Sequence, residues 1–153
     1  MKSDIPIPSE NYKYIQMKKT LLVLISPMVV AAIVLTGCDS HASPEASIER
    51  GDKIYTQYCL SWHQVDGSGV PQLNPPLKNS AYVLGEESKL ISIVTHGFNE
   101  GVEINGDTYT NPMPPIGADL KDEGIADVLT YVRNNFGNMA SAISAEQVKA
   151  LRK

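Results

Sequence analysis

Large aromatic side chains and cysteines are scarce in this sequence, which has one tryptophan, two phenylalanines and two cysteines among 153 residues. The part that would fold also holds long loops and few bulky apolar side chains. A domain of about 90 residues built in this way is marginally stable on its own core. We therefore expect a bulky apolar group at its centre that the amino acids do not supply.

Basic residues are few as well. After residue 37 the sequence carries 9 basic and 15 acidic side chains. Nucleic-acid binding requires a concentrated basic face, so this charge balance excludes nucleic acid as a partner. Internal repeats and low-complexity tracts are also absent, which excludes repeat architectures.

The N-terminal apolar run is too short for an ordinary spanning helix, which needs roughly 20 residues. It extends from Leu21 to Leu35, follows the basic Met17-Lys18-Lys19 and ends in Leu35-Thr36-Gly37-Cys38. This order is typical of a secretory signal peptide. We interpret residues 1–37 as a leader with a lipoprotein signal peptide whose true start is Met17.

The end of the leader resembles the bacterial lipobox, which implies that Cys38 receives lipid after cleavage. An uncleaved anchor helix and an ordinary buried cysteine are the alternatives. Residues 38–46 are polar and contain Pro44, and we interpret them as the lipidated cysteine and a flexible tether. The protein is then expected in the cell envelope, lipid-anchored to a membrane and facing the periplasm or the cell exterior.

Apolar residues at three- and four-residue spacing predict a mostly helical domain over residues 47–138. The first helix is expected to begin at an N-cap, Ser47, and to run into Cys59. Asn105-Gly106 between alternating arms predicts a β-hairpin. Further helices are expected over residues 86–96, 122–136 and, as a tail helix within 139–153, 144–152 with a capping box, whereas residues 66–81 and 111–117 are expected to form loops.

The stretch from Tyr58 to Gln64 reads YCLSWHQ. With a cysteine in place of Trp62 it would read C-x-x-C-H, the motif that attaches haem through two thioethers. Cys59 needs an explanation, because the assignment of Cys38 to lipid leaves it without a disulfide partner. The imidazole of His63 is a good donor to iron. The bulky apolar group that the core requires would then be a haem.

On these residues the sequence resembles the class I c-type cytochromes, over about residues 47–138. The resemblance implies an all-α, cytochrome c-like fold of three to five short helices with long loops wrapped round one haem. It implies His63 as the proximal iron ligand and Met113, in a proline-rich loop, as the distal ligand. We do not expect His41, His96 or Met139 to bind iron, because they lie in the tether, at a helix end and beyond the last helix of the domain.

The resemblance also assigns roles to three supporting residues. It implies that the carbonyl of Pro75 accepts a hydrogen bond from the second ring N–H of His63, which orients the ring. It further implies that the first and last helices touch closely at Gly51 and Tyr131. The alternatives are a plain turn proline at position 75 and, for Met113, a methionine that fills a gap in the core.

Trp62 cannot form the second thioether of a haem c. Three explanations stay open. One thioether forms at Cys59, with the indole against the free vinyl edge; or the haem is non-covalent or absent; or the natural protein has cysteine here, since the two codons differ at one base. The presence of His63, Met113 and the proline loop favours the first or the third.

The function these residues imply is a membrane-tethered single-haem electron carrier in an extracytoplasmic respiratory or dehydrogenase chain. Its expected partners are a dehydrogenase, oxidase or reductase complex, and it transforms no substrate of its own. A haem-free lipoprotein that uses the scaffold to bind a partner is the main alternative. A haem sensor or weak peroxidase would need an open iron position, and a Met113 ligand counts against it.

Overall fold

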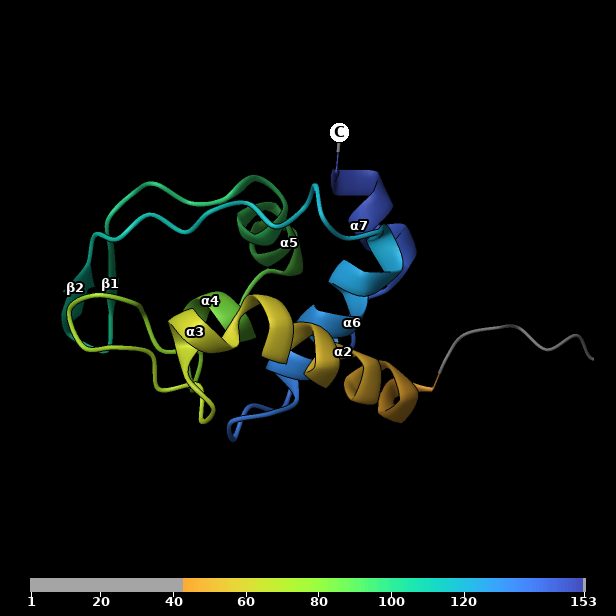
Figure 1. Cartoon of the computed structure of the whole chain (residues 1–153), viewed down its shortest axis with the longest axis horizontal. Coiled ribbons are helices and arrows are strands. Elements are labelled where there is room, and N and C mark those ends of the chain that lie inside the picture. The colour runs from red at the N-terminus through yellow and green to blue at the C-terminus, as the bar shows by residue number, and fades with distance from the viewer. Residues whose placement is uncertain (1–42, 153) are drawn as a thin grey trace, which may run out of the picture. The chain divides into compact units, whose positions relative to one another are not determined.

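The computed structural model describes residues 43–152 (Figure 1). Cys38, the signal peptide and His41 lie outside the described residues. Within this range no helix is long and apolar enough to cross a membrane. In chain order the elements are α2 (Pro44–Tyr58), α3 (Leu60–His63), α4 (Ala81–Leu84), α5 (Glu87–His96), β1 (Val102–Ile104), β2 (Asp107–Tyr109), α6 (Asp122–Arg133) and α7 (Ala145–Leu151).

Residues 43–152 thus form six helices, four of them with at least seven residues, and one two-stranded hairpin. This confirms the expected mostly helical fold. Figure 1 shows the hairpin at one end of the domain and α7 at the other. The short α4 was not predicted, because residues 66–81 were expected to form a loop and the next helix was expected to begin only at residue 86. It begins after Ser80, whose side chain accepts a hydrogen bond from the backbone N–H of Tyr82.

Helix α2 begins earlier than the sequence analysis predicted. Its N-cap is Ser43, whose side chain accepts a hydrogen bond from the backbone N–H of Ala46, and Pro44 occupies the first turn. The prediction of Ser47 as the N-cap is therefore wrong, because Ser-Pro already provides the preferred start. The Ser47 hydroxyl instead donates to a carboxylate oxygen of Asp127 at 2.7 Å. The last three residues of the expected tether are helical.

The predicted hairpin and the predicted tail helix are both present. Asn105 and Gly106 have φ angles of 55° and 88°, the left-handed values that a two-residue turn of this kind requires. The strands pair antiparallel, with Val102 opposite Tyr109. At α7, Ser144 and Gln147 form the reciprocal hydrogen bonds of a capping box.

Helix α6 ends at Arg133, three residues before its predicted end. Phe136 adopts a φ of 58°, so the chain turns back after the helix. Its ring then packs on Tyr55 and Tyr131, with centroid distances of 5.2 and 5.7 Å. Apolar spacing placed Phe136 on the helix because the spacing cannot distinguish a helical residue that packs on the core from a residue that follows the helix and packs on the core.

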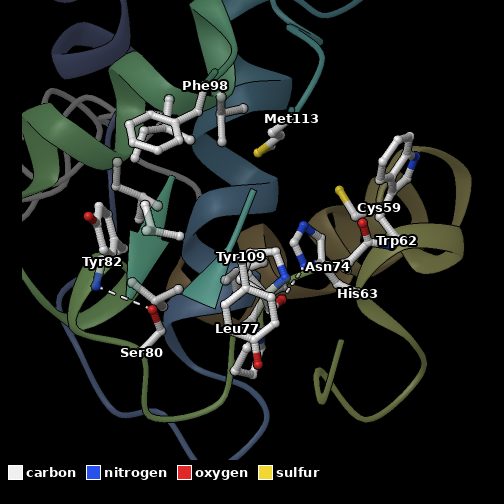
Figure 2. A pocket seen from close by; sticks show the side chains of 18 of the residues that line it. Cys59, Trp62, His63, Asn74, Leu77, Ser80, Tyr82, Phe98, Tyr109 and Met113 are labelled. Atoms are coloured by element: carbon white, nitrogen blue, oxygen red, sulfur yellow. Dashed lines mark hydrogen bonds between the residues drawn. The ribbon is translucent and has the colours of Figure 1, made fainter. Parts of the chain in front are cut away.

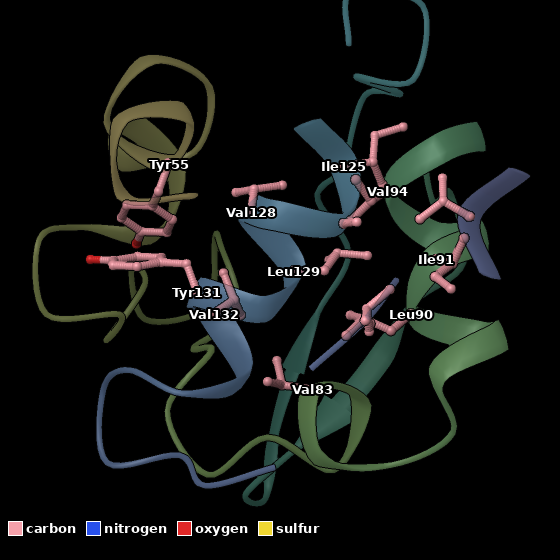
Figure 3. Packing of buried hydrophobic residues seen from close by; sticks show 13 residues of the cluster. Tyr55, Val83, Leu90, Ile91, Val94, Ile125, Val128, Leu129, Tyr131 and Val132 are labelled. Atoms are coloured by element: carbon pink, nitrogen blue, oxygen red, sulfur yellow. The ribbon is translucent and has the colours of Figure 1, made fainter. Parts of the chain in front are cut away.

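The core is organised around α6, which lies between α2 and α5 (Figure 3). Helices α2 and α6 cross closely at Gly51, because a Cβ there would lie 2.2 Å from the carbonyl oxygen of Asp127 and 2.6 Å from the Cβ of Tyr131. The expected contact between Gly51 and Tyr131 is therefore present. Arg50 fixes the same crossing by donating two hydrogen bonds to the carboxylate of Asp127, at 2.6 and 2.7 Å.

Tyr55 and Tyr131, whose rings contact each other in this core at an interplanar angle of 45°, give a test of the packing at high pH. Burial raises the pKa of Tyr55 and raises that of Tyr131 to about 12, from an ordinary value of 10. The folded state keeps these protons above pH 10 while the unfolded chain releases them, so stability should fall as the pH rises above 10. We expect both tyrosines to ionise only together with loss of the helical circular-dichroism signal.

The measurement is a titration followed by tyrosinate absorbance and circular dichroism in parallel. In Tyr55→Phe and in Tyr131→Phe, the late absorbance step should lose about half its amplitude. Complete ionisation of all tyrosines before the helical signal changes would contradict the buried placement of these rings.

Candidate functional site

A deep, largely apolar cavity opens between α3, the hairpin and helices α5 and α6. Together with the open space at its mouth, it comprises about 1150 Å³ that protein atoms do not fill. Its wall combines the chain around Cys59 and His63, the loop at Pro75, the hairpin and the loop at Met113. The cavity therefore provides a place for the bulky apolar group that the scarcity of aromatic residues led us to expect.

His63 closes one wall of the cavity and is only 7% exposed. Its Nδ1 lies 3.0 Å from the carbonyl oxygen of Pro75. A carbonyl can only accept, so Nδ1 carries the hydrogen and Nε2 of the neutral ring keeps its lone pair. Burial lowers the pKa of His63, against a smaller opposing effect of the Pro75 hydrogen bond. The ring is therefore neutral at neutral pH and can donate to a metal through Nε2.

One helical turn places Cys59 and His63 on the same wall. The backbone N–H groups of Trp62 and His63 both donate to the carbonyl of Cys59, at 3.0 and 2.9 Å. Figure 2 shows the Cys59 sulfur and the His63 ring at the cavity, with the Trp62 indole beside them. Burial raises the pKa of the Cys59 thiol to about 11, so the thiol stays protonated at neutral pH. Trp62 is 36% exposed at the cavity edge.

The loop before Pro75 is held tightly against the histidine. Val70 and Asn74 exchange two backbone hydrogen bonds, and the N–H of Gly69 donates to the carbonyl of His63 at 3.0 Å. Gly69 has a φ of 67°, and a Cβ there would lie 2.3 Å from the carbonyl oxygen of Asn74. Only glycine fits this position without strain, and the close approach fixes the carbonyl that orients His63.

Met113 lies on the facing wall. It exchanges two backbone hydrogen bonds with Phe98, at 2.8 and 2.9 Å, directly after α5. Figure 2 shows its sulfur directed into the cavity toward the His63 side. Met139 is 92% exposed and His96 is exposed at the end of α5, so neither contributes to the cavity.

A polar link that was not predicted from the sequence joins the two loops. The side-chain amide of Asn111 donates to the side-chain oxygen of Asn74 at 2.8 Å. Each asparagine precedes a proline, Pro112 and Pro75 respectively, and this repeated Asn-Pro pair is the signal that could have revealed it. The link joins the loop that orients His63 to the loop that carries Met113.

A second missed residue, Asn138, supports the loop after Pro75. It is buried, its side-chain amide donates to the carbonyls of Leu77 and Val132, and its oxygen accepts from the N–H of Asn79. Nothing in its local sequence distinguishes it from an ordinary turn asparagine. It ties the loop to the end of α6.

The donor set fits a planar metal macrocycle. An imidazole nitrogen and a thioether sulfur lie on facing walls of an apolar cavity, and a protonated thiol lies one turn from the imidazole. Imidazole and thioether are the axial donors of electron-carrying haem proteins, and a thiol can form a covalent link to a haem. The third side chain of such a motif is the indole of Trp62.

The family model described as "Cytochrome c" matches residues 48–136. Cytochrome c-552 of Thermus thermophilus is 36% identical over 111 residues, which cover 67% of this chain and 83% of that protein. The cytochrome c subunit of the quinone-dependent alcohol dehydrogenase of Gluconacetobacter polyoxogenes is 31% identical over 115 residues. The gluconate 2-dehydrogenase cytochrome c subunit of Pantoea cypripedii is 35% identical over 109 residues. The match covers 72% and 69% of this chain, but only 24% of either subunit.

Proposed function

Because this chain belongs to the cytochrome c family of electron-transfer proteins, we propose that it is a membrane-tethered single-haem electron carrier whose haem c is attached through one cysteine. One observation carries the proposal: Cys59, His63 and Met113 come from two distant parts of the sequence and meet at one apolar cavity. A gap-filling methionine or a surface histidine would not require this arrangement.

In this proposal His63 is the proximal ligand through Nε2, Met113 is the distal ligand, and Cys59 supplies the single thioether. Haem bound here supplies a one-electron couple at its iron. With His63 and Met113 both holding the iron, no position would remain for a substrate, so outer-sphere electron transfer would be favoured over oxygen chemistry. The hydrogen bond to Pro75 holds the His63 ring in one orientation and strengthens it as a donor.

The proposals for the membrane tether and for the redox partners are based on the amino-acid sequence and its relatives. We propose that Cys38 is lipidated and that the protein faces the periplasm or the cell exterior. The dehydrogenase cytochrome subunits among its relatives support a redox complex of the dehydrogenase, oxidase or reductase class as the partner.

The first test is a haem-linkage measurement on protein purified from its native membrane. It combines acid–acetone extraction, a pyridine haemochrome spectrum and the intact mass. We expect haem to stay with the protein, a haemochrome shifted from the two-thioether position, and a mass that includes one haem, Trp62 and the lipid on Cys38.

Other outcomes contradict different parts of the proposal. Freely extracted haem would contradict the thioether at Cys59 but leave a haem-binding carrier. Two thioethers with cysteine at position 62 would contradict the single attachment. A colourless protein would contradict the electron carrier and favour the haem-free lipoprotein.

A further inference from the structure

The loop that carries Met113 is held by α5 and by Phe98, two residues after that helix. Phe98 pairs with Met113 through two backbone hydrogen bonds, and the N–H of Ile116 donates to the carbonyl of Val94 at 3.2 Å. Gly117 lies so close to α5 that a Cβ would meet the carbonyl oxygen of Thr95 at 2.5 Å. These contacts fix the backbone from Met113 to residue 117.

The segment that follows, from residue 117 to the first residue of α6 at position 122, is held by Arg152, 30 residues beyond Asp122 in the chain. The guanidinium of Arg152 donates to the carbonyls of Gly117 and Leu120, the latter at 2.6 Å, and to the carboxylate of Asp122 at 2.7 Å. One planar group therefore engages three acceptors between Met113 and the first turn of α6. Figure 1 shows this segment passing α5 and reaching α7 before it enters α6.

Arg152 directly follows α7, a helix that is itself anchored to the core. Val148 of that helix is 0% exposed. Glu87, in the first turn of α5, accepts hydrogen bonds from Ser141 and Gln147 and pairs with the buried Arg133. The tail helix is thus joined to α5 and α6, so its position is set by the core.

We propose that Arg152 is a positioning residue for Met113. By fixing residues 117–122, which follow directly on the Met113 loop, it limits the movement that would carry the Met113 sulfur away from the cavity. This inference rests on the proposed role of Met113 as an iron ligand, and it gives the tail helix a function that the sequence analysis did not assign.

Arginine is suited to this role because its rigid fork presents donors in several directions at once. A surface ion pair between Arg152 and Asp122 alone would contribute little. The hydrogen bonds to the carbonyls of Gly117 and Leu120 matter more for positioning, because these carbonyls belong to the backbone of residues 117–122, which must stay in place.

The test uses the oxidised, haem-loaded protein and imidazole as a competing ligand that displaces a thioether from the iron. Loss of the weak far-red absorption of a methionine-ligated haem measures the displacement. We expect Arg152→Gln to bind imidazole about tenfold more tightly than the parent, which corresponds to ~1.4 kcal/mol. Arg152→Lys should give a smaller shift, since an ammonium cannot reproduce the fork.

The matched control is Lys149→Gln, which removes a positive charge from the exposed face of the same helix. Its imidazole affinity should stay within about twofold of the parent. A second readout is hydrogen exchange at the amide of Ile116, which should become faster in Arg152→Gln and stay unchanged in the control.

The possible outcomes test the role of Arg152 and the assignment of Met113 separately. If Arg152→Gln only lowers the free energy of unfolding in urea and its imidazole affinity stays within about twofold of the parent, Arg152 is structural and the inference is overturned. If the parent itself lacks the far-red band, the Met113 assignment fails and the inference fails with it. Should Arg152→Gln yield no folded protein, Arg152→Lys and Asp122→Asn must show the shift, or the inference is overturned.

Discussion

Replacing Gly51 with alanine should destabilise the domain by about 3 kcal/mol, and valine at this position should abolish cooperative folding. The alanine Cβ would lie 2.2 Å from the carbonyl oxygen of Asp127, which is backbone of α6 and cannot turn aside. The two helices must separate, which also strains the hydrogen bonds from Arg50 and Ser47 to the Asp127 side chain. Since native domains are stable by only about 5–15 kcal/mol, this loss is large.

Urea unfolding of both variants measures the effect, and Gly124→Ala is the matched control. Gly124 lies in α6 beside the same crossing, but a Cβ there would have its nearest neighbour at 3.5 Å, an ordinary contact. Alanine at position 124 should stabilise the domain by about 0.5–1 kcal/mol, because glycine is the poorer helix former. Equal effects at the two positions would show that helix propensity, and not the close crossing, decides the result.

Replacing Cys59 with serine should release all the haem from the protein in acid–acetone, whereas the parent should retain it.

Replacing Trp62 with cysteine tests the opposite change, the addition of a second attachment point at position 62. This position lies at the cavity edge, next to His63 and about one turn from Cys59, and its backbone N–H donates to the carbonyl of Cys59. Trp62→Cys should therefore restore the second thioether and move the pyridine haemochrome to the two-thioether position.

A matched control separates geometry from the mere addition of a thiol. Ser61→Cys places the new cysteine on the neighbouring exposed residue, which does not line the cavity. Its haemochrome should stay at the parent position. A Cys59→Ser variant that still holds haem through acid–acetone extraction would rule out Cys59 as the attachment point.

Much of this fold could be predicted because its local signals are strong. The Asn105-Gly106 turn and the Ser144 capping box are each specified by residues within four positions of one another, and both are present. The prediction of Ser47 as the N-cap of α2 was wrong because this local signal is not unique. Several serines can cap a helix, and the preference for Pro44 in the first turn decided between them.

The end of α6 shows where local sequence patterns no longer predict the backbone. Phe136 continues the apolar spacing of the helix, yet its partly buried ring packs on Tyr55, 81 residues earlier in the chain. A spacing rule records that a side chain is buried and says nothing of what buries it. The backbone therefore leaves the helix three residues early to satisfy a contact that only the folded chain provides.

The helical class, the hairpin, the resemblance to the c-type cytochromes and the residue types that can hold a haem could all be inferred from the amino-acid sequence. These follow from propensities, turn residues and a short motif, all of which act within a few positions. Only the tertiary structure brought Met113 opposite His63, joined their loops through Asn74 and Asn111, and placed Arg152 on residues 117–122. Such contacts depend on how helices pack across the core, because side chains tens of residues apart meet only when the packing of the whole domain fixes their positions.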